Sequence, residues 1–177
     1  MRCFISINLP DTIKEEAARI QSLISLAGLN IVKKDNLHLT LAFLGEISEE
    51  MKEKCISSLK EIKYSPLKAS LGNFGFFPSE REVRVIWISL EPKENFKELN
   101  TLIKNQLKKN FSIDNRFESH ITLFRATSFK KYSDFFDEFK KIEIIKKEFE
   151  VNYFSLMKSA LTKKGPIYEE ISRFSLI

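Results

Sequence analysis

A chain of 177 residues with 43% apolar and 30% charged residues can bury a core and has the composition of an ordinary water-soluble protein. No apolar run approaches the roughly 18 residues that a membrane span needs, which argues against a membrane protein. The net charge of +5 is compatible with a polyanionic partner such as RNA, although a lysine-rich solvated surface is the simpler explanation.

The cysteines and histidines narrow the class further. Two of each are present, without the spacing of zinc ligands, so we expect no metal and no cofactor. Cys3 lies in an apolar run and Cys55 on an apolar helical face, which is typical of buried thiols in a reducing compartment. Because Met1 to Phe4 leads directly into a strand pattern and not into a signal peptide, we expect a cytoplasmic protein, and a monomer.

Hydrophobic spacing predicts strands and helices in alternation along the whole chain. Apolar residues recur at helical spacing after Pro10, Ser48 and Pro92, and Ser48 is placed to cap its helix. The expected strands lie at about 3–9, 31–32, 38–44, 67–77, 83–90, 120–125, 149–156 and 167–176, and the expected helices at about 12–28, 48–62, 94–109 and 132–139.

The two halves of this pattern resemble each other. Pro10 and Pro92 each follow a strand and precede a helix, and they lie 82 residues apart (92 − 10). His38 and His120 each open a later strand, and they are also 82 residues apart (120 − 38). We therefore expect residues 1–177 to form a single domain of two pseudo-symmetric lobes, although common strand–helix units can recur by chance.

Both histidines stand in the same motif, His38-Leu39-Thr40 and His120-Ile121-Thr122. On a strand, residues i and i+2 point to the same face, so each imidazole is expected to project together with a threonine hydroxyl. Leu39, Leu41, Phe43, Ile121 and Leu123 are expected on the opposite face, in the core.

Two such strands facing each other would give two imidazoles and two hydroxyls around one pocket, which suits phosphoryl chemistry without a metal. Opening a cyclic phosphodiester needs a base on the attacking side and an acid on the leaving side. Histidine can be either near neutral pH, and threonine can donate hydrogen bonds to phosphate oxygens. A single histidine on a strand is usually structural, but the repeated motif favours a site.

The sequence resembles the 2H phosphoesterase superfamily, and within it the RNA 2′,3′-cyclic phosphodiesterase (2′–5′ RNA ligase-like) family. The resemblance implies an α+β, bilobal LigT-like fold, with two antiparallel sheets and outer helices around a central cleft. It also implies that His38 is the proton donor and His120 the proton acceptor. The residues that carry it are 2–10, 36–46 (NLHLTLAFLGE), 74–78 (FGFFP), 85–87, 117–125 (FESHITLFR) and 165–168 (GPIY).

Two positions near the second motif depart from the family pattern: Ser119 replaces a proline, and Phe124 replaces a small residue. Strand alternation would place Phe124 on the cleft face, where it could contact substrate. Arg125 matches a family arginine that binds phosphate, but alternation would turn it away from the cleft unless the strand contains a bulge. A route for the RNA backbone could involve Lys33, Lys34, Arg116, Lys163 and Lys164, and Tyr168 is expected in the core or at the rim.

These observations predict an enzyme that hydrolyses RNA-terminal 2′,3′-cyclic phosphate to a 2′-phosphomonoester. A 2′–5′ RNA ligase, which would use similar groups in the reverse direction, is a second interpretation. A nucleotide- or RNA-binding module with weak catalysis is a third. Turnover of a small nucleoside 2′,3′-cyclic phosphate separates the enzymes from the binding module.

Overall fold

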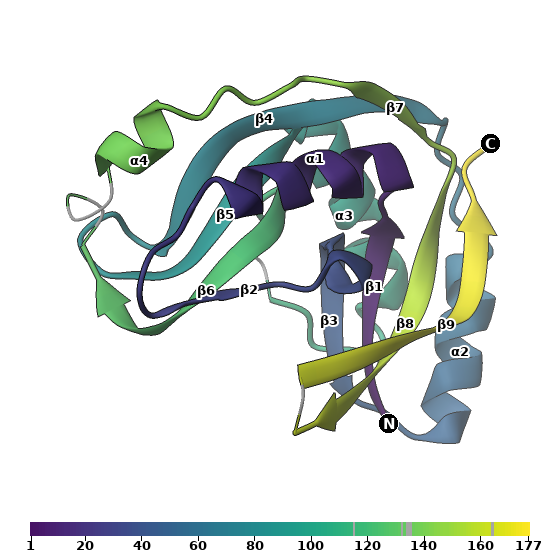
Figure 1. Ribbon diagram of the computed structural model, residues 1–177. Coiled ribbons are helices and arrows are strands. Elements are labelled where there is room, and N and C mark those ends of the chain that lie inside the picture. Colours follow the sequence, from purple (N-terminus) through teal and green to yellow (C-terminus); the bar gives the residue numbers. More distant parts are fainter. Residues whose placement is uncertain (115, 132, 134–135, 164) are drawn as a thin grey trace.

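The computed structural model describes residues 1–177 except 115, 132, 134–135 and 164, and except the side chain at 129 (Figure 1). Strands and helices alternate within this part of the chain, as the sequence predicts. The strands are β1 (Arg2–Asn8), β2 (Leu29–Ile31), β3 (His38–Glu46), β4 (Leu67–Pro78), β5 (Val83–Glu91), β6 (His120–Lys130), β7 (Glu148–Val151), β8 (Tyr153–Thr162) and β9 (Gly165–Ser175). The helices are α1 (Asp11–Ser22), α2 (Glu49–Leu59), α3 (Lys93–Leu107) and α4 (Phe136–Lys140), with a short 3₁₀ turn η1 (Lys34–Asn36).

All the described strands belong to one antiparallel sheet in the order β7-β4-β5-β6-β3-β1-β8-β9, with β2 beside β6. The two motif strands, β3 and β6, are neighbours at its centre, joined by the pairing of Leu39 with Ile121. The α+β fold class is confirmed, and this junction links the two expected sheets into a single sheet. Figure 1 shows β1, β3, β8 and β9 on one side of the junction and β4, β5 and β6 on the other.

The helices differ from the sequence prediction mainly at their ends. Ser48 caps α2 as expected, because its hydroxyl accepts a hydrogen bond from the Met51 amide at 3.2 Å. Helix α1 ends at Ser22, well before Gly28, and the first residue expected in α4 lies outside the described residues. None of the described helices is long and apolar enough to cross a membrane.

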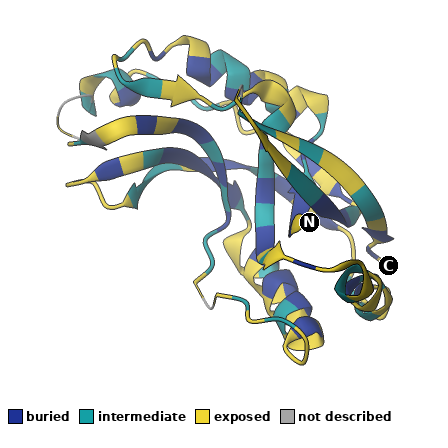
Figure 2. Cartoon of the chain, turned by 90° about the horizontal axis from the view of Figure 1, so that it is seen from below, coloured by how far each residue is buried: buried dark blue, intermediate teal, exposed yellow. Residues whose placement is uncertain are grey.

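Each long helix buries one apolar face against the sheet, which is the division into buried and exposed positions visible in Figure 2. Both cysteines are buried free thiols, as expected. The fully buried positions include Ile13, Ala17 and Ile20 of α1, Cys55 and Leu59 of α2, and Phe96, Leu99, Ile103 and Leu107 of α3. Helix α1 contacts β6 and helix α3 contacts β3, so each helix packs against the motif strand of the other half.

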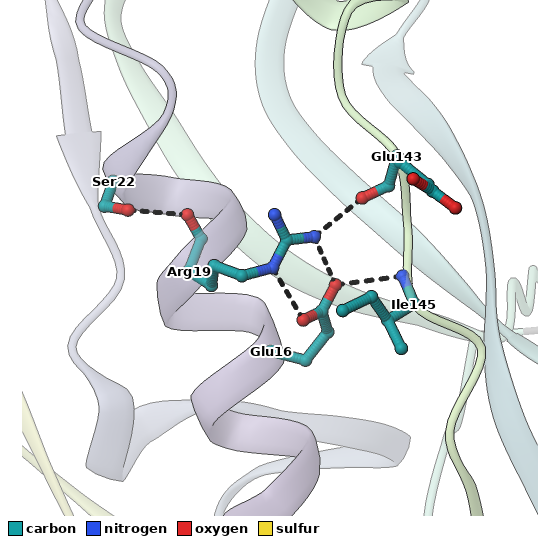
Figure 3. A network of polar contacts seen from close by, with 5 residues as sticks. All are labelled: Glu16, Arg19, Ser22, Glu143 and Ile145. Carbon is teal, nitrogen blue, oxygen red and sulfur yellow. Dashed lines mark hydrogen bonds and ion pairs between the residues drawn. The ribbon is translucent and has the colours of Figure 1, made fainter.

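A buried carboxylate fixes α1 against the segment before β7 (Figure 3). Both Glu16 carboxylate oxygens accept hydrogen bonds from the Arg19 guanidinium, at 2.8 and 2.7 Å, and one also accepts from the Ile145 amide. Arg19 in turn donates to the Glu143 carbonyl at 2.6 Å. The hydrogen bond from Arg19 holds the pKa of Glu16 below its usual range, so this carboxylate is ionised at neutral pH.

Gly75 tests the packing behind the second motif. Any Cβ at this position would collide with the Trp87 ring, which packs 5.7 Å from the His120 ring between centroids. We predict that Gly75→Ala lowers the free energy of unfolding by about 1–3 kcal/mol, the usual cost of overpacking. Trp87 is the only tryptophan, so the fluorescence emission should shift as well. The exposed Asn73→Ala on the same strand is the control, and an unchanged melting temperature and spectrum in Gly75→Ala would contradict the packing.

Candidate active site

The two motifs meet in a cavity of about 900 Å³ between the halves of the sheet. His38, Thr40, His120 and Thr122 all line it, so the predicted convergence of the two motifs is observed. In the described part of the chain, no three His, Cys, Asp or Glu side chains gather in a way that would hold a metal ion. The other residues lining the cavity come mainly from β1, the segment 30–36, the end of β3 and the β8–β9 hairpin: Arg2, Cys3, Phe4, Asn30, Ile31, Val32, Lys33, Asn36, Phe43, Gly45, Arg125, Ser159, Leu161, Lys163, Gly165, Pro166 and Tyr168.

The chain itself fixes the orientation of the His38 ring. Its Nδ1 lies 2.7 Å from the Asn36 carbonyl oxygen, which can only accept a hydrogen bond, so Nδ1 carries a proton. In the neutral ring, Nε2 is then free to accept, and it lies 3.0 Å from the Thr40 hydroxyl. Phe4 and Tyr168 pack against the ring with centroids 5.0 and 5.2 Å away.

His120 is held in the corresponding way. Its Nδ1 lies 2.8 Å from the carbonyl oxygen of Glu118, which like Asn36 stands two residues before its histidine. Phe77 contacts the ring edge-to-face at a centroid distance of 4.9 Å. Lys93 forms an ion pair of 2.9 Å with the Glu118 carboxylate. Each histidine is thus fixed with Nδ1–H toward the backbone, which leaves Nε2 as the nitrogen available for proton transfer.

Both imidazoles are neutral in the free protein at neutral pH. Burial lowers the pKa of His38 to about 4, and the positive charges of His120 and Arg125 act in the same direction. Burial also lowers the pKa of His120, although the nearby Glu118 carbonyl and carboxylate oppose that shift. An anion in the cavity would favour the protonated rings, because its charge would replace the hydration that burial removes.

A bulge follows each motif at the same offset. Opposite β1, residues Ile5 and Ser6 pair with Ala42 and Thr40, so Leu41 is an extra residue in β3. Opposite β5, residues Ile86 and Trp87 pair with Phe124 and Thr122, so Leu123 is an extra residue in β6. Each bulged leucine lies three residues after its histidine. Since a bulge shifts the alternation of side chains by one residue, strand positions beyond it change face.

The bulges decide which side chains reach the cavity. The bulge that Arg125 was expected to require is present, and Arg125 lines the cavity. The expectation that Phe124 faces the cleft is wrong: its side chain is 1% exposed and belongs to the core. The assignment of Phe43 to the core is also wrong, because this side chain is 67% exposed and lines the cavity.

The remaining predicted residues divide between the cavity and the outer surface. Tyr168, Lys33 and Lys163 line the cavity. Lys34 pairs with Glu15 instead, and Arg116 pairs with Asp114 away from the cavity. Lys164 lies outside the described residues. The cavity residues that sequence reasoning missed, Arg2 and Phe4, come from β1, whose place beside β3 no local pattern indicates.

Comparisons with known proteins give the class. The family model described as LigT like Phosphoesterase matches residues 7–87 and 89–168, so the chain belongs to this family.

Curated relatives share the whole length of the chain. The RNA 2′,3′-cyclic phosphodiesterase of Methanocaldococcus jannaschii is 37% identical over 98% of this chain and 100% of its own length. The protein of the same name from Archaeoglobus fulgidus is 34% identical over 98% and 99%. Among solved structures, a Thermus thermophilus protein superimposes with a TM-score of 0.85, at 28% identity over 99% and 98% of the two chains. The E. coli LigT complex with 3′-AMP gives 0.81, at 26% identity over 99% and 97%.

The low pKa of His38 predicts an acid-sensitive contribution to stability. Between its usual pKa of roughly 6.5 and its folded value of about 4, the folded protein binds fewer protons at this site than the unfolded chain. The stabilisation is therefore complete above pH 6.5 and is lost as the pH falls toward 4. We predict that the wild type loses about 1–3 kcal/mol more than His38→Gln over this range. Denaturant unfolding at several pH values measures the difference, and parallel curves for the two proteins would contradict it.

Proposed function

We propose that this protein hydrolyses the 2′,3′-cyclic phosphate at RNA ends to a 2′-phosphomonoester, with His38 as proton donor and His120 as proton acceptor. The observation that carries the proposal is the pair of imidazoles in one cavity, each with Nδ1–H bound to a backbone carbonyl. The printed names of its relatives, RNA 2′,3′-cyclic phosphodiesterase, support the substrate class. Free, buried Cys3 and Cys55 support a reducing cytoplasm, and we propose that the enzyme acts there as a monomer.

The reaction needs one proton removed and one supplied. Nε2 of His120 takes a proton from water while the water oxygen forms a bond to phosphorus. The bond from phosphorus to O3′ breaks, and the protonated Nε2 of His38 gives its proton to the leaving O3′. The phosphate stays on O2′, and proton exchange with solvent restores the two rings.

The substrate itself supplies the electrostatic condition for this cycle. In the free protein both rings are neutral, so His38 must gain a proton before it can act as an acid. The negative charge of the bound cyclic phosphate raises the pKa of His38 and so favours that proton. The guanidinium of Arg125, which lines the same cavity, can pair with a non-bridging phosphate oxygen. Thr40 and Thr122 can donate hydrogen bonds to the others.

Substitution of the histidines tests the proposal directly. We predict that His38→Ala and His120→Ala each lower the rate on an RNA oligonucleotide with a 2′,3′-cyclic phosphate end by roughly 10²–10⁴-fold, the usual effect of losing a positioned acid or base. Thr40→Ala and Thr122→Ala should lose less, because each removes one hydrogen bond. Single-turnover rates measure the losses, and ³¹P NMR of the product should show the 2′-phosphate.

Gln106→Ala, on the exposed side of α3, is the control for this series and should keep the wild-type rate. Full activity in a folded His38→Ala or His120→Ala protein would contradict the assigned residues. A mainly 3′-phosphate product would contradict the assigned orientation of the substrate. Loss of turnover on treatment with a chelator, restored by Mg²⁺ or Mn²⁺, would contradict the two-histidine mechanism.

A further inference from the structure

A buried amide side chain holds each of the two bulges that follow the motifs. The Gln21 side chain on α1 is 4% exposed, and its Nε2 donates to the Leu123 carbonyl at 2.8 Å and to the Val32 carbonyl at 2.9 Å. The Asn100 side chain on α3 is 3% exposed, and its Nδ2 donates to the Leu41 carbonyl at 2.6 Å. Leu41 and Leu123 are the extra residues of the two bulges.

The two amides act across the halves of the chain. Gln21 belongs to the first half and binds the motif strand of the second, whereas Asn100 belongs to the second half and binds the motif strand of the first. A bulge disrupts the regular ladder, and a buried polar group that loses its partner is costly, so a fixed donor stabilises the bulged form. The same arrangement at two equivalent positions supports a built feature of the fold.

The bulge at Leu123 has a consequence for the cavity. The register on the far side pairs Arg125 with Asn30 of β2, and the Val32 amide donates to the Leu123 carbonyl at 2.9 Å. Gln21 therefore joins the bulge to the end of β2 through two carbonyls. Without the extra residue, strand alternation would turn Arg125 toward the core and Phe124 toward the cavity.

We propose that Gln21 is a positioning residue for Arg125: it holds the Leu123 bulge and thereby keeps the guanidinium in the cavity, where it binds phosphate. Gln21 does not line the cavity, so it acts only through the strand. The network of Glu16 and Arg19 one turn earlier fixes α1 and so the origin of this donor. This inference rests on the proposed function for the phosphate-binding role of Arg125.

A double-mutant cycle tests the inference with inorganic phosphate as the probe, by calorimetry. Gln21→Met keeps the length of the side chain but removes both hydrogen bonds. We predict that it weakens phosphate binding roughly 3–30-fold in the Arg125 protein and less than about 2-fold in the Arg125→Ala protein, because contacts in one network are non-additive. The matched control, Gln106→Met on the exposed side of α3, should leave phosphate binding unchanged in both backgrounds.

An equal loss in both backgrounds, or no loss in a folded Gln21→Met protein, would overturn the inference. If Gln21→Met does not fold, Gln21→Asn replaces it, since the shorter side chain keeps an amide but withdraws it from the Leu123 carbonyl. Absence of phosphate binding by the wild type would contradict this inference and the proposed function together. Coupled phosphate binding without turnover of a cyclic phosphate would contradict the proposed function alone.

Discussion

The site depends on the antiparallel meeting of β3 and β6, where Leu39 pairs with Ile121 at the centre of the sheet. This contact brings together two motifs that are 82 residues apart in the sequence. Because the paired residues sit between the histidine and the threonine of each motif, the four polar side chains project from one shared face. The helices reinforce the junction, since α1 packs on β6 and α3 packs on β3.

The same junction sets the electrostatics of the cavity. Burial lowers the pKa of both rings, and Arg125 adds a positive charge on the side where an anion would bind. A cavity with neutral imidazoles and a fixed cation is prepared for a phosphate, whose charge completes the site. Carbonyls two residues before each histidine fix the tautomer, so the ring nitrogens need no carboxylate partner.

Sequence patterns predicted what local rules govern and failed where a bulge intervened. Alternation correctly placed His38 and His120 on one face with their threonines, and apolar periodicity gave the helices. Alternation beyond Leu41 and Leu123 failed, so Phe43 was wrongly assigned to the core and Phe124 to the cavity. The carbonyls of these two leucines bind Asn100 and Gln21, which are distant in the sequence, and no local pattern indicates such a contact. Only the family resemblance pointed to Arg125.

The measurement that tests the two-imidazole site most directly is a ¹⁵N NMR titration of the histidine side chains with inorganic phosphate. The chain has two histidines, so both rings can be followed without ambiguity. The account predicts that at neutral pH both free rings are neutral with the proton on Nδ1, and that saturating phosphate shifts both rings and protonates His38. Rings that are already protonated in the free protein, or a response confined to one histidine, would contradict a shared phosphate site.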